Sequence, residues 1–294
     1  MPNEALLILD SKNAEACRRL ADSANPPASL LKRFSGSTLP GLMECFFLGA
    51  RHSTMATLRK ELREKIRQAE EPWRSLGQAW DRSDTTEYNV FEARQFEFKK
   101  IDSKTWGSDE ENWNLFEQRF LSGLRNVGFG SEFAHSVLRV FHEMAENVTQ
   151  HGNCKNGLVE GLAGYHVEPG RFSFSVGDLG RGFLRSLQES SSWSQLETSK
   201  DALKAVIYEG ASRRFGQGEG EGFKQLWKAL ANHGALVRIR SGNSVASIRP
   251  TSTGKEVEIS TIFESPGSHI SVCCALGINP TESNHRFFFT RSLD

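Results

Sequence analysis

The segment FHEMAENVTQHG, residues 141–152, places a carboxylate, an amide and an imidazole along one row of an amphipathic helix. Glu143, Asn147 and His151 are four residues apart, so their side chains lie close to one stripe of the helix. This stripe is either the solvated edge of a surface helix or the wall of a pocket. An apolar face borders it, comprising Phe133, Val137, Val140, Phe141, Met144 and Val148.

Helices precede strands in the sequence around this segment. Residues 108–130 and 131–152 each begin at a serine and end at a glycine, which predicts two consecutive helices. Alternating apolar residues over 161–178, interrupted by Pro169–Gly170, predict a β-hairpin. This order of elements predicts a two-layer α/β sandwich. The further elements expected are a short helix within 184–210, a helix at 223–234, and strands at 235–242, 256–264 and 268–276.

The first hundred residues are charged and are expected to be mainly helical. The segment at 56–73 has opposite charges four residues apart, which predicts an exposed helix. Loop-forming residues place the domain boundary between 83 and 107. We therefore divide the chain into an N-terminal helical partner or regulatory region, residues 1–104, and a second domain, residues 105–294.

The overall composition is that of a soluble protein. Lysine plus arginine and aspartate plus glutamate each number 36, so the formal net charge is zero and gives no sign of a nucleic-acid-binding surface. The first residues lack the basic start of a signal peptide, and the apolar runs are too short to span a bilayer. We therefore expect a cytoplasmic protein with no membrane association.

The five cysteines are scattered and form no Cys-x-x-Cys pair, which argues against a zinc site. An odd number of cysteines fits reduced thiols better than a disulfide framework. Cys273 and Cys274, in the segment SVCCAL, are expected to be small apolar residues of a buried strand.

Glycines at every second position precede the helix expected at 223–234. Gly218, Gly220 and Gly222 lie in GQGEGEG, residues 216–222. Glycines allow the backbone to approach a ligand, and the N-terminus of a helix binds phosphate. The segment is thus either a phosphate-binding loop or a flexible loop before a helix. It matches neither the dinucleotide pattern nor a P-loop.

Asp178 begins the segment DLGRG, residues 178–182, directly after the strand-like FSFSVG. Its carboxylate therefore emerges from the end of a sheet, where it can accept a hydrogen bond from an exocyclic amine such as that of adenine. An ordinary loop aspartate is the alternative. On the helix, the amide oxygen of Asn147 suits Mg²⁺, and Glu143, one turn earlier, can take a proton from a nucleophile that attacks a phosphate.

The three segments EMAEN, DLGRG and GEGEG, in this order, resemble the motifs of the GHKL ATPase superfamily. That group contains gyrase, chaperone, histidine-kinase and mismatch-repair ATP-binding domains. The chain is most similar to its histidine-kinase-like and anti-sigma-factor branch, in which the first motif often continues to His-Gly, as His151–Gly152 does here. The resemblance covers roughly residues 108–280. It implies the Bergerat-type ATP-binding fold, with ATP and Mg²⁺ as ligands.

The resemblance also implies roles for the residues that bind the base and activate the nucleophile. Asp178 would bind adenine, and Gly180 and Gly182 would shape its pocket. Glu143 would be the catalytic base. The neighbouring Glu146 lies about 100° around the helix and is expected to be a surface or structural carboxylate.

Further implied roles concern the phosphates. Asn147 would hold Mg²⁺ against them, and residues 183–217 would form a mobile lid. The roles of His151, Arg213 and Arg214 stay open. His151 is either close to the phosphates or a cap at the end of its helix, and the two arginines either reach the γ-phosphate or are solvated charges of the lid. The glycines that would hold the phosphates are Gly218, Gly220 and Gly222.

Three functions fit this set of residues. The first is a serine/threonine kinase of a partner protein, of the anti-sigma type. The second is an ATP-gated interaction switch that slowly hydrolyses ATP while residues 1–104 contact the partner. The third, a degenerate domain used as a scaffold, is disfavoured because Glu143, Asn147 and Asp178 are all present. A sensor histidine kinase is not expected, since residues 1–107 contain no phosphoacceptor helix. We expect a protein partner and leave a homodimer open.

Overall fold

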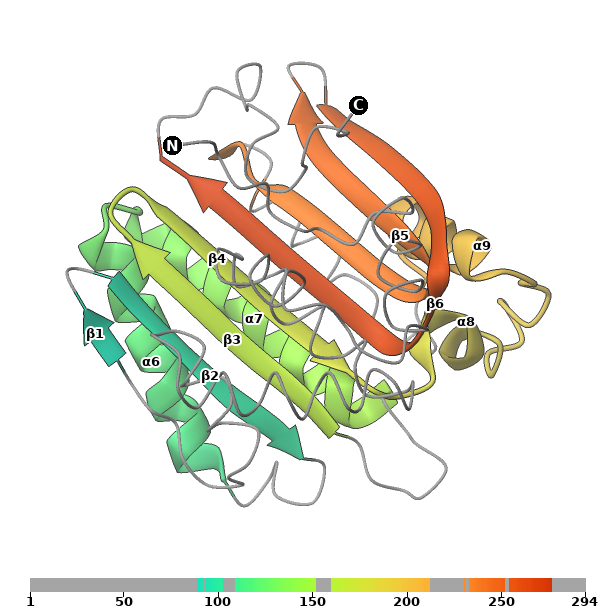
Figure 1. Ribbon diagram of the computed structural model, residues 1–294, viewed down its shortest axis with the longest axis horizontal. Helices are drawn as coiled ribbons and strands as arrows, with labels where there is room; N and C mark the ends of the chain where they lie inside the picture. Colours follow the sequence, from blue (N-terminus) through green and yellow to red (C-terminus); the bar gives the residue numbers. More distant parts are fainter. Residues whose placement is uncertain are drawn as a thin grey trace, which may run out of the picture.

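The described residues form a six-stranded antiparallel sheet with helices on one face (Figure 1). The structure is a computed structural model, and it describes residues 89–91, 94–102, 109–151, 160–211, 230, 233–251 and 254–276. Across the sheet the strands follow the order β1 (Asn89–Phe91), β2 (Arg94–Asp102), β3 (Glu160–Glu168), β4 (Arg171–Asp178), β6 (Gly254–Ala275) and β5 (Leu236–Thr251). This arrangement of two layers confirms the predicted α/β class.

Two long helices cover the middle of the sheet. They are α6 (Glu110–Asn126) and α7 (Ser131–His151), and they confirm the two helices predicted from serine and glycine boundaries. Acidic residues in the first turn of α6 and Arg125 in its last turn complement the helix dipole. The shorter elements that follow the β3–β4 hairpin are α8 (Gly182–Leu187), α9 (Ser199–Lys204) and a π-helical turn, η2 (Ala205–Glu209).

An aromatic core lies between the two long helices and the sheet. The rings of Phe120 and Tyr165 stack with centroids 4.6 Å apart, and Phe141 meets Phe174 edge to face. Such pairs stabilise a core by about 1 kcal/mol each beyond their buried area. The apolar face predicted for the α7 segment is confirmed, because all six of its residues are buried in this core: Phe133, Val137, Val140, Phe141, Met144 and Val148.

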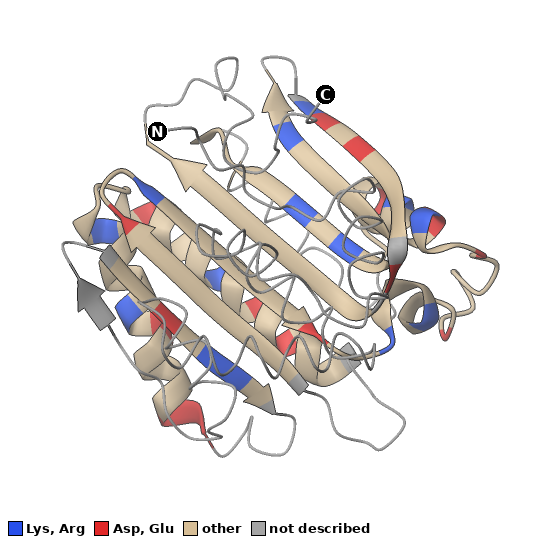
Figure 2. Cartoon of the chain, in the orientation of Figure 1, with Lys and Arg blue, Asp and Glu red and all other residues tan. Residues whose placement is uncertain are grey.

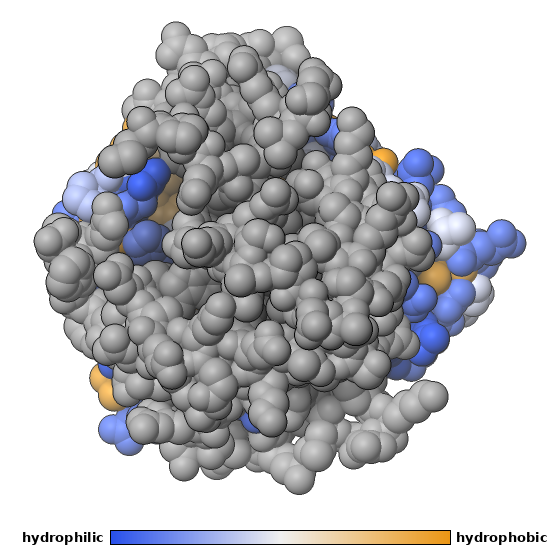
Figure 3. All heavy atoms as spheres, in the orientation of Figure 1, coloured by the Kyte–Doolittle hydropathy of each residue, from blue (hydrophilic) through white to orange (hydrophobic). Residues whose placement is uncertain are grey.

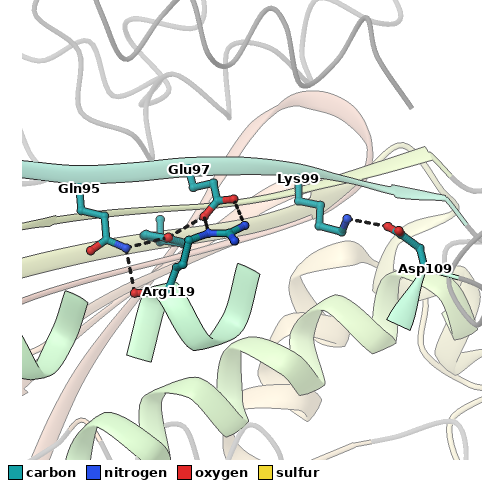
Figure 4. Close-up of polar contacts among 6 residues, drawn as sticks. Gln95, Glu97, Lys99, Asp109 and Arg119 are labelled. Atoms are coloured by element: carbon teal, nitrogen blue, oxygen red, sulfur yellow. Dashed lines mark hydrogen bonds and ion pairs between the residues drawn. The ribbon is translucent and has the colours of Figure 1, made fainter. Parts of the chain in front are cut away.

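Strand β2 is joined to α6 by polar side chains (Figure 4). The buried carboxylate of Glu97 accepts hydrogen bonds from Arg119 Nη2 at 2.5 Å, from Arg119 Nε at 3.0 Å and from the Tyr165 hydroxyl at 2.7 Å. Lys99 forms an ion pair with Asp109 at 2.5 Å. These contacts attach β2 to the helix layer through charged groups.

The sheet begins on the N-terminal side of the predicted domain division. Strands β1 and β2, residues 89–91 and 94–102, fall within the predicted N-terminal region, residues 1–104. Nevertheless β1 pairs with β2, and β2 pairs with β3 of the second domain along eight residues. The helix predicted at 56–73 lies outside the described residues.

The last part of the sheet differs from the prediction of separate strands. Residues 256–264 and 268–275 belong to one strand, β6 (Gly254–Ala275), which bends sharply beside α8 (Figure 1). Its register with β5 shifts on either side of Gly242, and Gly242 and Gly267 both have positive φ. Because of these bulges, β6 continues through the turn-like Pro266–Gly267 instead of ending there.

The two adjacent cysteines lie in β6 as free thiols. Cys274 is buried, and burial raises the pKa of its thiol to about 12. Cys273 is partly buried, and burial likewise raises the pKa of its thiol. The predicted strand in SVCCAL is therefore confirmed, and its thiols are protonated at neutral pH.

Acidic and basic residues are interspersed along the helices and strands (Figure 2). At the edge where α8 and α9 lie, the visible residues are mostly hydrophilic, with isolated hydrophobic ones (Figure 3). Within the described ranges, no helix is both long enough and apolar enough to cross a membrane.

Candidate functional site

Asp178, the last residue of β4, has its carboxylate buried at the end of the sheet. Oδ1 accepts the backbone N–H of Gly180 at 2.7 Å, and Oδ2 accepts the N–H of Ser268 at 3.2 Å and its hydroxyl at 2.5 Å. Burial raises the pKa of this carboxyl, although the three donors act in the opposite direction. A carboxylate accepts about four hydrogen bonds, so the described donors leave capacity for one more.

Gly267 lies directly against Asp178. A β-carbon at position 267 would overlap the carbonyl oxygen of Asp178 and come within 2.7 Å of its Oδ1, and the φ of +69° also favours glycine. The Gly267 N–H donates to the carbonyl of Gly180 at 2.7 Å. Gly267 and Ser268 together therefore hold the DLGRG loop against β6.

The sequence did not identify Gly267 and Ser268 as site residues. They lie about ninety positions after Asp178 and reach it only because β4 and β6 pair. The available signal was the segment PGSHI, in which Pro-Gly marks an irregular backbone and a serine directly follows.

Gly180 and Gly182 lie beside Asp178, where the sequence predicted them. Gly180 supplies the N–H that Asp178 Oδ1 accepts. Gly182 begins α8 with a φ of +73°, and a β-carbon there would lie 2.7 Å from Ser241 Oγ and 2.9 Å from the carbonyl oxygen of Gly267. Its lack of a side chain thus allows the loop to pack on both β5 and β6.

The end of α7 that carries Asn147 lies behind the end of β4 (Figure 1). Gly161 of β3 pairs with Asp178, and a β-carbon at Gly161 would overlap Val148 Cγ1. Glycine at this position therefore lets α7 approach the strand ends. Asn147 and Glu143 are both half-buried beside the buried face of α7. The structure thus places Val148, the residue after Asn147, against the strand end that carries Asp178.

The phosphate part of the predicted site lies outside the described residues. This holds for Gly218, Gly220 and Gly222, for Arg213 and Arg214, and for the side chain of His151. The roles of these residues therefore stay predictions.

The described part of the predicted lid, residues 183–211, is packed on the β5–β6 hairpin. A β-carbon at Gly242 would overlap the hydroxyl of Ser199, at the start of α9. Lys255 Nζ donates to the carbonyl of Ile207 at 3.2 Å and lies 5.5 Å from the centroid of the Tyr208 ring. Residues 182–209 are therefore attached to the sheet at both α9 and η2.

Asn147 has the chemistry required of a magnesium ligand. Its amide oxygen is hard and half-buried, and Mg²⁺ typically takes one or two protein oxygens and fills its shell with water and phosphate oxygens. Among the residues that the structure describes, no three His, Cys, Asp or Glu side chains form a group that could hold a metal.

This arrangement has two chemical capacities. The carboxylate of Asp178 can accept one further hydrogen bond next to backbone without side chains, which suits the amine of a flat heterocycle. The amide of Asn147 and the carboxylate of Glu143, one turn apart on α7, can bind a cation or move a proton.

No protein-family model matches this chain, and no curated protein does. Among solved structures, it is similar to the 43K ATPase domain of Thermus thermophilus gyrase B in complex with an aminocoumarin. The sequences are 13% identical and the TM-score is 0.24, with 51% of this chain and 36% of that chain covered. A likeness of this size carries no argument about the ligand.

Proposed function

We propose that the chain is a Mg-ATP-binding signalling protein that phosphorylates a partner protein on serine or threonine. The observation that supports it most is the geometry of Asp178. Its carboxylate is buried at a strand end, receives three hydrogen bonds and retains capacity for a fourth beside Gly180 and Gly267. The exocyclic amine of adenine is a donor that meets this requirement.

The catalytic step is assigned to Glu143. The hydroxyl oxygen of the partner attacks the γ-phosphorus, the bond to the bridging oxygen breaks, ADP leaves, and the carboxylate of Glu143 takes the hydroxyl proton. Glu143 precedes Asn147 by one turn, about 6 Å along the axis, so the base and the metal ligand lie on one side of α7. When bound, Mg²⁺ neutralises charge that develops on the phosphate oxygens.

An ATP-gated interaction switch is the second candidate, and the position of β2 favours it. Gly161 of β3 pairs with Ile101 of β2 on one side and with Asp178 of β4 on the other. Strand β2, which ends the N-terminal region, is therefore separated from β4, the strand that carries Asp178, by β3 alone. A change at the base-binding residue can reach that region through two adjacent strand pairs.

Labelled ATP separates these functions. The purified full chain is incubated with γ-labelled ATP, Mg²⁺ and cell lysate. Transfer of the label to serine or threonine of one protein supports the kinase, whereas release of phosphate alone supports the switch. If the full chain binds no ATP, both functions are rejected.

Variants of α7 test the assignment of the base. Glu143→Gln should abolish turnover while ATP still binds, and Asn147→Ala should weaken binding only when Mg²⁺ is present. Glu146→Gln is the matched control, since it is also half-buried on α7 but lies on a different side of the helix. Normal turnover by Glu143→Gln would show that another group is the base.

The partner and the location belong to the same proposal. We propose a protein partner that contacts residues 1–104, in the cytoplasm, with a homodimer as an open alternative. Size-exclusion chromatography with light scattering, with and without ATP, measures the oligomeric state.

A further inference from the structure

Ser241 is a polar residue in an apolar row. It follows Val237 and Ile239 on the side of β5 that faces the helices, and both of those residues are part of the core. The side chain of Ser241 is also buried, with 2% exposure. A hydroxyl in such a place requires hydrogen-bond partners, because its desolvation is otherwise unfavourable.

The Ser241 hydroxyl joins two parts of the candidate site. It accepts the backbone N–H of Phe183 at 2.8 Å and donates to the carbonyl of Gly267 at 3.4 Å. Phe183 directly follows the DLGRG loop, and Gly267 lies against Asp178. One hydroxyl therefore connects the far end of the loop to the strand that holds the Asp178 carboxylate.

The position of Ser241 is itself fixed by irregular backbone. The pairing of β5 with β6 shifts between Ser241 and Gly242, and Ser241 still pairs with Ser268. Gly242 packs against Ser199 at the start of α9. Bulges of this kind typically direct a side chain to a site.

We propose that Ser241 is a positioning residue for base recognition by Asp178. Its hydroxyl holds the end of the DLGRG loop on β6, so that the backbone at Gly180 leaves room for a planar base whose amine donates to Asp178. This inference rests on the proposed nucleotide-binding function. It adds that selection of adenine over guanine depends on a residue of β5, outside the recognised motifs.

Nucleotide discrimination tests the proposal. Guanine presents a carbonyl oxygen where adenine presents an amine, and a carboxylate disfavours that oxygen. The wild-type chain should therefore bind ADP more tightly than GDP. Loss of one buried hydrogen-bonding group should reduce the ratio of the two Kd values about tenfold in Ser241→Ala. Ser241→Thr, which keeps a hydroxyl, should restore most of the ratio.

Ser244→Ala is the matched control. Ser244 is equally buried on β5, and its hydroxyl bonds to Asn243 and not to the Asp178 loop. This variant should keep the wild-type ratio even if it lowers stability. An unchanged ratio in Ser241→Ala, or an equal loss in Ser244→Ala, would overturn the proposal.

If the wild-type chain binds neither nucleotide, the proposed function is rejected. Hydrogen exchange then tests separately whether Ser241 positions the Asp178 loop. The amide of Phe183 should then exchange faster in Ser241→Ala than in the wild type, and Ser244→Ala should leave it unchanged. Faster exchange would keep Ser241 as the positioning residue of the Asp178 loop, for a different ligand. Unchanged exchange would remove that role as well.

Discussion

The backbone of Gly267 lies against both the carbonyl and the carboxylate of Asp178, with no room for a β-carbon between them. The contact is tight because Ser268, the next residue, donates two hydrogen bonds to the same carboxylate. Strands β4 and β6 are therefore locked together at the point where the base is proposed to bind.

Gly267→Ala should disrupt this contact. The new β-carbon would overlap the Asp178 carbonyl, and a φ of +69° is unfavourable for alanine. We expect the free energy of unfolding to fall by about 2–3 kcal/mol, measured by urea denaturation, and nucleotide binding to weaken strongly. Gly130→Ala is a comparison with open space around its β-carbon. A fully stable Gly267→Ala variant would contradict the observed packing.

Asp178→Asn should reveal a pH-dependent cost of the buried carboxylate. Burial raises the pKa of Asp178 in the folded chain, so the folded state favours the protonated form. Relative to the Asn variant, the wild type should lose stability as the pH rises from about 3.9 through the folded pKa, and should then level off. Urea denaturation of both proteins across this range measures the difference. A wild type that instead gains stability would show that the donors outweigh burial.

Gly161→Ala should push α7 away from the strand ends. Its β-carbon would overlap Val148 and lie 2.9 Å from the carbonyl oxygen of Gly177. We expect a loss of about 1–3 kcal/mol in unfolding free energy. In a Val148→Ala background the loss should be smaller, because one of the two obstacles is gone. Equal losses in both backgrounds would mean that Val148 is not the obstacle.

Local signals in the sequence predicted the elements whose boundaries are local. The segments between serine and glycine predicted both helices, although α6 occupies only Glu110–Asn126 of the predicted 108–130, and the alternation around Pro169–Gly170 located the β3–β4 hairpin. The positions of Asp178, Gly180 and Gly182 in one loop followed from the same reasoning. These features depend on residues that are neighbours in the chain.

The orientation of strand β2 could not be predicted in this way, because its side that faces α6 is polar. Gln95, Glu97 and Lys99 point toward the helix, and Phe96 and Phe98 lie on the opposite side. Alternation normally identifies the apolar side as the side facing the core. Here buried polar bonds to α6 take the place of apolar contacts.

The residues that hold Asp178 and its loop could not be predicted for a different reason. Ser268 and Ser241 reach the loop through strand pairing across long stretches of chain, and no local pattern encodes that pairing. Pro266–Gly267 indicated a break between strands, whereas the backbone continues through a bulge. Long-range register decided both features.

The His142–Glu117 pair should make stability depend on pH near neutrality. His142 Nδ1 lies 2.7 Å from Glu117 Oε1, and this hydrogen bond raises the pKa of His142. The charged pair therefore contributes stability below the unfolded value of about 6.5, and this contribution is lost as the pH rises through the folded pKa. His142→Ala should destabilise the chain more at pH 6 than at pH 9, as measured by urea denaturation. In a Glu117→Gln background this pH difference should largely disappear.

Arg119→Leu should destabilise the chain through the carboxylate it leaves behind. Glu97 is fully buried, and Arg119 supplies two of its hydrogen bonds while Tyr165 supplies a third. Removing the arginine leaves a buried negative charge with one donor, which should lower the unfolding free energy by about 3 kcal/mol. The double variant Glu97→Gln/Arg119→Leu should recover part of this loss, because the charge is removed with its partner. Thermal and urea denaturation of the two single variants and the double variant give the coupling energy, and strictly additive losses would show that the two residues act independently.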